Sequence, residues 1–416
     1  MLWVALHFPQ FRRQALARGH APPEPEREAL AGLGAWACQF TPRVSLEPPQ
    51  ALLLEVEGSL RYFGGRWKFL ARLREGLKAL GFEARLAEAP AARAALWRAR
   101  GDGGRLEAQP VAVMDLAPQA AALLAGLGVR TVGGLARLPR EGLARRFEAG
   151  LLARLDQALG RAPEPRAFFA PPARFEARLE MPAPLREAGQ ALFAARRLLA
   201  QMEGFLAARQ AGVRAFALEL LHEDAPATRV DVGLAGAGRE AAHFARLLRE
   251  RLGALALRSP IEAIRLAAGA LEPLAERSAR LFDERPGGGE GWLRVIERLQ
   301  ARLGSAAVHG LDTHEDHRPE RAFRQVDLRN EDLNQKERRE KQGETLGLRP
   351  LWLLDPPRPL AEGEFALLAG PERVESGWWD GAEALRDYFI ARTGEASLAW
   401  IYREREGSWF LHGYFA

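Results

Sequence analysis

The stretch that decides the fold is Val213–Leu234, VRAFALELLHEDAPATRVDVGL. Two segments rich in strand-forming residues, 213–221 and 228–234, flank a short polar turn with Pro226, which predicts a β-hairpin. Apolar periodicity also predicts strands over 174–181 and 261–268 and amphipathic helices over 186–209 and 239–256. The order βαββαβ predicts a four-stranded sheet with both helices on one face and the other face free.

The residues before this unit predict a smaller set of strands and helices. The strands are expected at 1–9, 44–47, 51–57 and 82–88, and the helices at 26–40, 67–80 and 90–100. Residues 116–160 have the pattern of short helices interrupted by glycine and proline. Glycine- and proline-rich stretches at 100–104 and 161–165 separate these parts. The sequence therefore predicts a multidomain α+β protein.

The chain after residue 275 has a different composition. Residues 312–345 are polar, and residues 349–416 regain apolar content with five of the ten tryptophans. The strands are predicted near 364–369, 396–404 and 408–415, around a helix at 381–392. This pattern predicts a C-terminal α/β extension.

Composition excludes several classes of protein. With 416 residues, of which 47% are apolar and 27% charged, the chain is long enough for several buried cores. No apolar run reaches the roughly 18 residues of a membrane span, and the start lacks a signal-peptide pattern. The single cysteine, Cys38, forms neither an internal disulfide nor a cysteine metal cluster, and its apolar surroundings favour core packing. We expect a cytoplasmic protein with no membrane partner.

The two parts of the chain differ in charge. Residues 1–275 carry 38 Lys and Arg against 28 Asp and Glu, a net charge of +10. Residues 276–416 carry 21 against 26, a net charge of −5. The basic front part suits a phosphate backbone, whereas the acidic rear part does not.

A Gly-X-Gly turn between two predicted helices, within Leu123–Leu135, is typical of a helix-hairpin-helix motif. Gly126 and Gly128 let the backbone approach a phosphate, and the helix that opens at Thr131 directs N–H groups towards it. Arg130 is placed for a second phosphate contact. We predict that these four residues bind DNA, and a plain αα-hairpin is the alternative.

The clustered carboxylates on predicted strands are Glu47, Glu55 and Glu57, and the last two are expected to share a face. Two-metal phosphoryl transfer needs carboxylates from neighbouring strands, yet the first strand, Leu2–Phe8, has none. His7 lies at the end of that strand, where a structural role is favoured over metal binding. A metal centre is therefore not predicted here.

The remaining chemistry-bearing residues form no known nucleotide or metal motif. The sequence has no Walker A loop, no dinucleotide-binding glycine pattern and no paired-histidine zinc motif. His314 and His317 lie among Asp312, Glu315 and Asp316, where a polar loop is favoured over a metal site. We therefore predict neither a metal nor a cofactor.

Together these residues resemble the Y-family, or lesion-bypass, DNA polymerases over residues 1 to about 275. Leu2–Leu6 is similar to the first palm strand, Val44–Ser59 to the second palm motif and Leu127–Leu135 to the thumb hairpin. The βαββαβ unit is similar to the little finger, the additional DNA-binding domain of that family. The resemblance implies a polymerase-like body that binds DNA.

The acidic catalytic positions of that family are largely lost. The first metal-binding aspartate falls at Ala5, and the Asp-Glu pair falls at Glu47 and Pro48. The interval between the first strand and Gln39 is too short for the fingers domain. The resemblance thus implies no catalytic residues and no polymerase activity. The alternative is an active lesion-bypass polymerase with a rearranged metal site built on the three clustered glutamates.

A narrower resemblance, to the ImuB family, covers nearly the whole chain. The matching segments are Phe40–Pro49, Arg209–Val213, Asp316–Glu320, Arg349–Leu354, Ser376–Gly381 and Trp409–Ala416. ImuB proteins are inactive Y-family-like subunits of bacterial inducible-mutagenesis cassettes. The resemblance implies a nucleoid-associated adaptor in the SOS response to DNA damage, which joins DNA, the sliding clamp, an ImuA-type RecA-like accessory protein and an error-prone C-family polymerase in translesion synthesis. A scaffold that binds proteins only is a further alternative.

The resemblance also divides the chain into five parts. Residues 1–105 correspond to a reduced palm with the fingers largely missing, and residues 106–172 to a helical thumb. Residues 173–275 correspond to a little-finger-like domain. Residues 276–348 form a linker, and residues 349–416 form a C-terminal partner-binding domain.

The rear part offers two candidate partner sites. Four residues match positions of a clamp-binding peptide: Gln325, Val326, Asp327 and Leu328. Arg329 takes the place of the apolar anchor that normally contributes much of the binding energy. Trp378 and Trp379 are assigned to partner binding because tryptophan is enriched at interface hot spots, and a place in a small core is the alternative.

Overall fold

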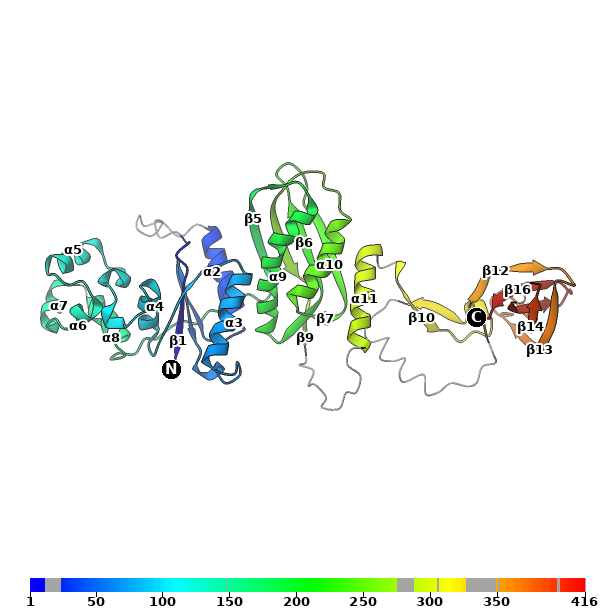
Figure 1. Ribbon diagram of the computed structural model, residues 1–416, viewed down its shortest axis with the longest axis horizontal. Coiled ribbons are helices and arrows are strands. Elements are labelled where there is room, and N and C mark those ends of the chain that lie inside the picture. The colour runs from blue at the N-terminus through cyan, green and yellow to red at the C-terminus, as the bar shows by residue number, and fades with distance from the viewer. Residues whose placement is uncertain are drawn as a thin grey trace. The chain divides into compact units, whose positions relative to one another are not determined.

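The computed structural model describes residues 1–11, 24–147, 149–274, 288–304, 307–326, 349–350, 352–394 and 397–415. The chain divides into two compact units, Met1–Arg302 and Leu303–Ala416, shown in Figure 1. Helices and sheets both occur in the first unit and strands dominate the second, so the predicted α+β class is confirmed. Among the described residues, no helix combines the length and the apolar character needed to cross a membrane.

The first sheet is antiparallel and has the strand order β2-β3-β1-β4. Its strands are β1 Trp3–His7, β2 Val44–Glu47, β3 Ala51–Glu55 and β4 Arg85–Ala89. Within central β1, Ala5 pairs with Leu53 on one side and with Ala87 on the other. All residues of β1 and β3 are buried, which explains why both strands are nearly continuous apolar runs in the sequence.

Helices cover both faces of this sheet. α2 (Glu24–Ala37) and α3 (Arg66–Ala79) pack on the face that contains Val4 and Leu6. α4 (Ala92–Arg100) covers the opposite face, and its apolar cluster continues into four further helices. These are α5 Pro118–Gly126, α6 Val132–Ala136, α7 Arg140–Arg146 and α8 Ala149–Ala158, which confirms the helical prediction for 116–160.

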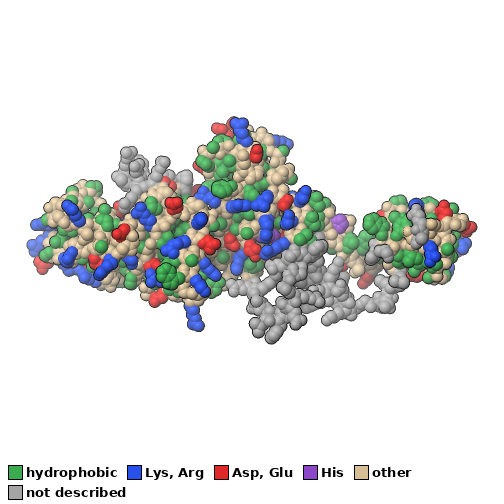
Figure 2. Space-filling model, in the orientation of Figure 1, with side chains coloured by type: hydrophobic (Ala, Val, Ile, Leu, Met, Phe, Trp, Pro, Cys, Tyr) green, Lys and Arg blue, Asp and Glu red, His purple; other side chains and the backbone are tan. Residues whose placement is uncertain are grey.

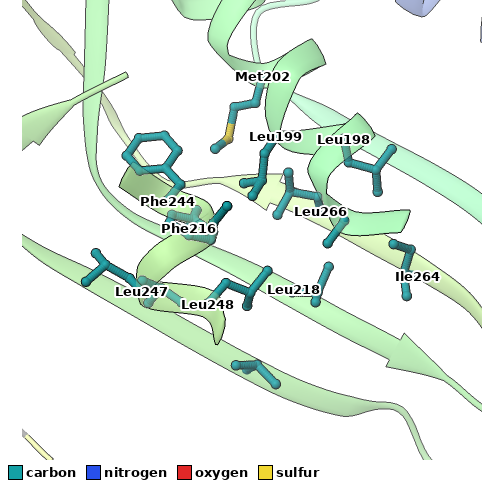
Figure 3. Close-up of a cluster of buried hydrophobic side chains, with 14 of the residues drawn as sticks. Leu198, Leu199, Met202, Phe216, Leu218, Phe244, Leu247, Leu248, Ile264 and Leu266 are labelled. Carbon is teal, nitrogen blue, oxygen red and sulfur yellow. The ribbon is translucent and has the colours of Figure 1, made fainter. Parts of the chain in front are cut away.

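The βαββαβ order is also confirmed. Its elements are β5 Glu176–Leu185, α9 Ala191–Ala207, β6 Ala211–Leu221, β7 Thr228–Gly238, α10 Ala241–Gly253 and β8 Ile261–Ala268. The strand order is β5-β8-β6-β7, and a short β9 (Leu271–Pro273) pairs with the start of β6. In Figure 3, Met202 of α9 and Phe244 of α10 lie against Phe216 of the sheet, within one buried cluster.

α9 also packs tightly against α2 of the first sheet. A Cβ at Gly204 would lie 2.3 Å from Trp36 Cδ1, and a Cβ at Gly32 would lie 2.0 Å from Gln201 Nε2. A Cβ at Gly204 would press on the rigid Trp36 ring, whereas at Gly32 it would have to displace the end of the Gln201 side chain. The two helices therefore approach each other closely because small residues face large ones across the interface.

α11 (Gly288–Leu303) lies beside β7, the last strand of the sheet. The Ala235 N–H of β7 donates to Glu297 Oε1 at 2.8 Å, and Glu297 Oε2 lies 2.6 Å from His243 Nε2 of α10. The glutamate and the histidine are both buried. A carboxylate of α11 thus satisfies a backbone group at the edge of the sheet and connects it to α10.

The described residues of the second unit form two antiparallel sheets. β10 (Gly310–Thr313) pairs with β11 (Phe323–Val326), and a five-stranded sheet has the order β12-β16-β15-β14-β13. The five strands are β12 Trp352–Leu360, β13 Phe365–Ser376, β14 Ala384–Thr393, β15 Leu398–Glu404 and β16 Trp409–Tyr414. The strands predicted near 364–369, 396–404 and 408–415 correspond to β13, β15 and β16.

The helix predicted over 381–392 is wrong, because this segment forms most of β14. Its buried residues Ala384, Tyr388 and Ala391 are four and three positions apart, which is the spacing on one face of a helix. In the strand, Tyr388 and Ala391 belong to different apolar clusters on opposite faces of the sheet. A strand buried on both faces loses the alternation that identifies a half-exposed strand. Within 352–394 and 397–415 the extension is therefore built from strands and is not α/β.

Candidate functional site

Ala5, which the resemblance predicts at the position of the first metal-binding aspartate, lies in the middle of β1 with an exposed fraction of 0%. It shares a buried cluster with Leu53 and Ala87 of the neighbouring strands and with Ala95 of α4. Because α4 contacts β1, β3 and β4, this face of the sheet is a packed core. A carboxylate at this position would be buried among apolar side chains.

Glu47, at the end of β2, is held by an arginine. Arg166 Nη1 donates to Glu47 Oε2 at 2.8 Å, and Arg166 Nη2 donates to Glu164 Oε1 at 2.5 Å. The Arg166 side chain is buried, with 8% of its surface exposed. Its guanidinium lies beside Glu47 and neutralises the negative charge of this carboxylate. The same charge would be needed to bind a divalent cation.

The same network continues to α4. Glu164 Oε2 accepts from the Arg93 backbone N–H at 3.0 Å, and Glu164 Oε1 lies 3.0 Å from Arg93 Nη2. Burial lowers the pKa of the Arg93 guanidinium, and the charge of Glu164 opposes this shift. The segment that contains Glu164 also runs beside β2, because Phe169 N–H donates to the Val44 carbonyl at 2.7 Å. The stretch 161–165, which the sequence predicts to be a linker, thus lies next to the ion-pair network of Glu47.

Sequence reasoning missed the partners of Glu47. Arg166 lies 119 residues from Glu47 along the chain, next to the proline-rich stretch 161–165. No periodicity or local motif connects two residues at that separation. Arg166, directly after Pro165, is one of many arginines in the chain, so the sequence does not single it out as a partner.

The other two glutamates do not converge on Glu47. Glu47 pairs with Ala51 at the start of β3, whereas Glu55 ends the same strand, about 13 Å away at 3.3 Å per residue. Arg43 Nη1 donates to Glu55 Oε2 at 3.2 Å. Glu57 lies outside the strand, in the 3₁₀ turn Glu57–Ser59, so the expected shared strand face is not formed. Within the described ranges, no three His, Cys, Asp or Glu side chains are grouped so that they could hold a metal ion.

The predicted hairpin is present, and its turn is exposed. Gly128 has a φ of 72°, which favours glycine, and a Cβ at Gly126 or Gly128 would meet no atom within 4 Å. Thr131 is the N-cap of α6, and its Oγ1 accepts from the Gly134 N–H at 3.0 Å. Arg130 is exposed beside them. The structure therefore brings all four predicted residues together on one surface turn.

The electrostatics of this hairpin depend on side chains more than on the helix. α6 has only five residues, and its Val132 N–H already donates to the Gln109 carbonyl at 2.9 Å. Residues 118–160 carry six arginines against three acidic residues, a net charge of +3. Figure 2 shows several Lys and Arg side chains over the part of the molecule where α5 to α8 lie. A phosphate at this hairpin would therefore be attracted mainly by the arginine side chains.

The sheet face opposite α9 and α10 has paired charges. Ile264 and Leu266 of β8 point into the core, so Arg265 between them lies on the opposite face. Three arginines of this sheet lie beside a carboxylate: Arg265 beside Glu219, Arg229 beside Asp231 and Arg178 beside Glu180. Paired arginines offer less net charge to a phosphate backbone than unpaired ones. The hairpin is therefore the stronger candidate for DNA contact.

In the second unit, Arg318 connects two of the segments that carry the ImuB resemblance. Its Nη2 donates to Asp316 Oδ2 and to Asp380 Oδ2, both at 2.7 Å, and its Nη1 donates to the Ala382 carbonyl at 2.9 Å. The hydrogen bonds from Arg318 lower the pKa of Asp316 to about 2 and hold the pKa of Asp380 well below its usual range. Asp316, which lies near two histidines in the sequence, thus forms an ion pair with Arg318.

Trp378 and Trp379 lie on the loop between β13 and β14 that Arg318 holds. Their side chains are 77% and 59% exposed, and their rings meet edge to face with centroids 5.5 Å apart. Gly377 has a φ of 83°, and a Cβ there would lie 2.4 Å from Arg318 Nη1. Trp400, by contrast, is buried in the core of the sheet. Hydrogen bonds from Arg318 thus fix the loop, while its two tryptophans are exposed to solvent.

The clamp-binding candidate is only partly described. Gln325 and Val326 lie in β11, where they pair with Leu311 and Gly310 of β10. Gln325 is exposed. Asp327 and Leu328 lie outside the described residues, so the assignment of this motif stays a prediction.

The βαββαβ unit, the helical hairpin and the reduced first sheet define a polymerase-like α+β protein. The chain is 31% identical over 432 residues to Protein ImuB of Caulobacter vibrioides (strain NA1000 / CB15N), an alignment that covers 94% of each chain. Protein ImuB of the strain ATCC 19089 / CIP 103742 / CB 15 matches to the same extent. The chain belongs to the ImuB family. A scan against models of protein families finds no match.

Solved structures of Y-family DNA polymerases also resemble part of this chain. DinB from Sulfolobus solfataricus is 14% identical, covers 64% of this chain and 98% of its own, and has a TM-score of 0.32. A Dbh ternary complex is 13% identical, with the same coverage of both chains and a TM-score of 0.29.

Proposed function

We propose that this chain is a non-catalytic, polymerase-like adaptor for damage-induced mutagenic translesion synthesis. It binds DNA and links the sliding clamp, an ImuA-type RecA-like accessory protein and an error-prone C-family polymerase. The observation that supports the absence of catalysis is the packed metal position, where Ala5 is buried and Glu47 pairs with Arg166. Two-metal phosphoryl transfer needs several carboxylates at one place, and membership of the ImuB family supports the adaptor role.

In this proposal each part of the chain has a separate task. Residues 1–105 serve as a reduced palm that holds the body together, and residues 106–172 serve as a thumb. Residues 173–275 form the little-finger-like domain. Residues 276–348 link this body to the C-terminal domain, residues 349–416, which binds protein partners.

DNA contact is assigned to the exposed hairpin. Gly126 and Gly128 leave space for a phosphate beside the backbone, and Arg130 and the arginines of α7 supply positive charge. Contacts of this kind go to the phosphate backbone and not to the bases. Binding should therefore be independent of sequence and should weaken steeply as salt rises.

Protein contacts are assigned to the rear part of the chain, because residues 276–416 have a net charge of −5. Trp378 and Trp379 form an exposed pair on an anchored loop, which favours a hot spot for one protein partner. The peptide Gln325–Leu328 is assigned to the sliding clamp. These two sites are proposed to act independently.

A primer-extension assay with Mg²⁺ or Mn²⁺ tests catalytic silence, with an active lesion-bypass polymerase as the positive control. We expect no extension by this protein. Template-dependent extension that disappears in Glu47→Gln would establish the alternative, an active polymerase with a rearranged metal site.

DNA binding is measured with the same preparation at several salt concentrations. Arg130→Ala should weaken binding equally for unrelated sequences, whereas Arg358→Ala, an exposed arginine of the C-terminal domain, serves as the matched control. Absence of binding at low salt would favour the protein-only scaffold.

Pull-down with each purified partner tests the tryptophan site. The double variant Trp378→Ala/Trp379→Ala should lose the RecA-like protein or the C-family polymerase and keep its DNA affinity. Trp352→Ala, a third exposed tryptophan of the same unit, is the control. A double variant that keeps all its partners would remove this site from the proposal.

A further inference from the structure

The start of α3 displays an aromatic and basic surface that the proposed function does not use. We call the exposed residues Arg61, Tyr62, Arg66, Trp67 and Lys68 the α3 platform. Trp67 is 82% exposed and Tyr62 is 74% exposed. Large aromatic side chains normally bury most of their surface, so two exposed rings within six residues require an explanation.

A buried aromatic side chain fixes the backbone of the α3 platform. Phe63, between the exposed residues, is buried and packs against Phe69 with ring centroids 5.4 Å apart. The Tyr62 ring stands perpendicular to the Phe63 ring at 5.1 Å. Gly64 and Gly65 have φ values of 74° and 104°, which let the chain turn sharply into α3. Tyr62 is therefore presented by a turn with a buried anchor, and Trp67 by the first turn of α3.

The charge of the α3 platform has one sign. Residues 60–74 contain five Lys and Arg and no Asp or Glu. Arg66 Nε pairs with Glu88 Oε2 at 2.5 Å, while Arg61 and Lys68 are exposed. The first turn of α3 contains no acidic residue, so its cations add to the positive end of the helix dipole. Figure 2 shows several Lys and Arg side chains over the region of α3.

We propose that the α3 platform binds single-stranded DNA, with bases stacked on Trp67 and Tyr62 and the backbone phosphates held by the cations. Stacking accepts any base, because every base has a π-face, and nearby cations neutralise the phosphates. Duplex DNA hides its base faces, so the α3 platform should prefer single strands. An acidic protein surface would be attracted by the cations but would not need two open ring faces. This site is separate from the hairpin at Gly126–Thr131.

Fluorescence anisotropy of the full chain with a labelled fifteen-nucleotide oligo-dT tests the proposal at low salt. Trp67→Ala should weaken oligo-dT binding about tenfold, the loss expected for one stacked base, whereas Trp67→Phe should retain most of the affinity. Phe193→Ala removes another exposed aromatic ring, on α9, and serves as the matched control with unchanged affinity. Because Trp67 is exposed, its variants should unfold at the same temperature as the parent.

Two further probes separate stacking from simple charge attraction. An abasic oligomer of the same length should bind the parent more weakly than oligo-dT and should not respond to Trp67→Ala. A fifteen-base-pair duplex should bind the parent and Trp67→Ala equally, and its response to Arg130→Ala reports on the proposed function alone. Unchanged oligo-dT binding by Trp67→Ala, or an equal loss on the duplex, would overturn the proposal. Loss of a protein partner with unchanged oligo-dT binding would assign the surface to that partner.

Discussion

Ala5→Asp places an acidic side chain at the position that we propose for the first metal-binding aspartate, and we expect it to destabilise the protein without activating it. Ala5 is fully buried, between Leu53 and Ala87 in the sheet and beneath α4. Apolar neighbours cannot solvate a carboxylate, so the folded state would hold the new group in its neutral form. The pKa of the introduced aspartate is therefore expected to rise.

The size of this effect follows from proton linkage. An aspartate in the unfolded chain has a pKa of about 3.9, so keeping it neutral at pH 7 costs about 4 kcal/mol at roughly 1.4 kcal/mol per pH unit. The folded state then binds more protons than the unfolded state. The free energy of unfolding of Ala5→Asp should therefore fall as the pH rises above about 4, and at pH 5 this contribution should be only about 1.5 kcal/mol.

Urea unfolding of the parent, Ala5→Asp and Ala5→Asn at pH 5 and pH 7 measures this dependence. Asparagine has nearly the same size but does not titrate, so its loss of stability should be similar at both pH values. If Ala5→Asp and Ala5→Asn lose the same stability at both pH values, the carboxylate is solvated. In that case the sheet face is open and our account of the buried metal position is wrong.

Two other predictions concern packing and pH. Gly204→Ala should lower the free energy of unfolding by roughly 1–3 kcal/mol, because its Cβ would lie 2.3 Å from Trp36 Cδ1. Gly253→Ala, whose Cβ would meet no atom within 4 Å, should be neutral in the same urea titration, and equal effects would contradict this packing argument. The Asp316 carboxyl carbon should titrate by NMR near pH 2. Because this pKa is depressed in the folded state, the stabilisation is present above about pH 4 and is lost as the pH falls towards 2. Arg318→Lys should raise the midpoint, and a parent midpoint near 4 would refute the ion pair.

Local pattern in the sequence was sufficient for much of the fold. The hairpin within Val213–Leu234 and its flanking helices were predicted because each element has a one-sided apolar face with its own period. The turn at Gly128 and the N-cap at Thr131 follow from backbone conformation and short-range hydrogen bonding, which need only neighbouring residues. The proposal that Ala5 replaces the first acidic position likewise rests on the sequence alone.

Tertiary structure alone decided the partners of the charged residues and the environment of the least regular strand. Arg166 reaches Glu47 across 119 residues, and Arg318 reaches Asp380 across 62. Such pairs depend on where the fold places two distant segments, and no local period encodes that separation. β14 was misassigned because it is buried on both faces, so its burial pattern depends on the strands and clusters around it. The exposure of Trp67 could not be predicted either, because a tryptophan in an amphipathic helix normally faces the core. Only the fold shows which side of α3 is covered.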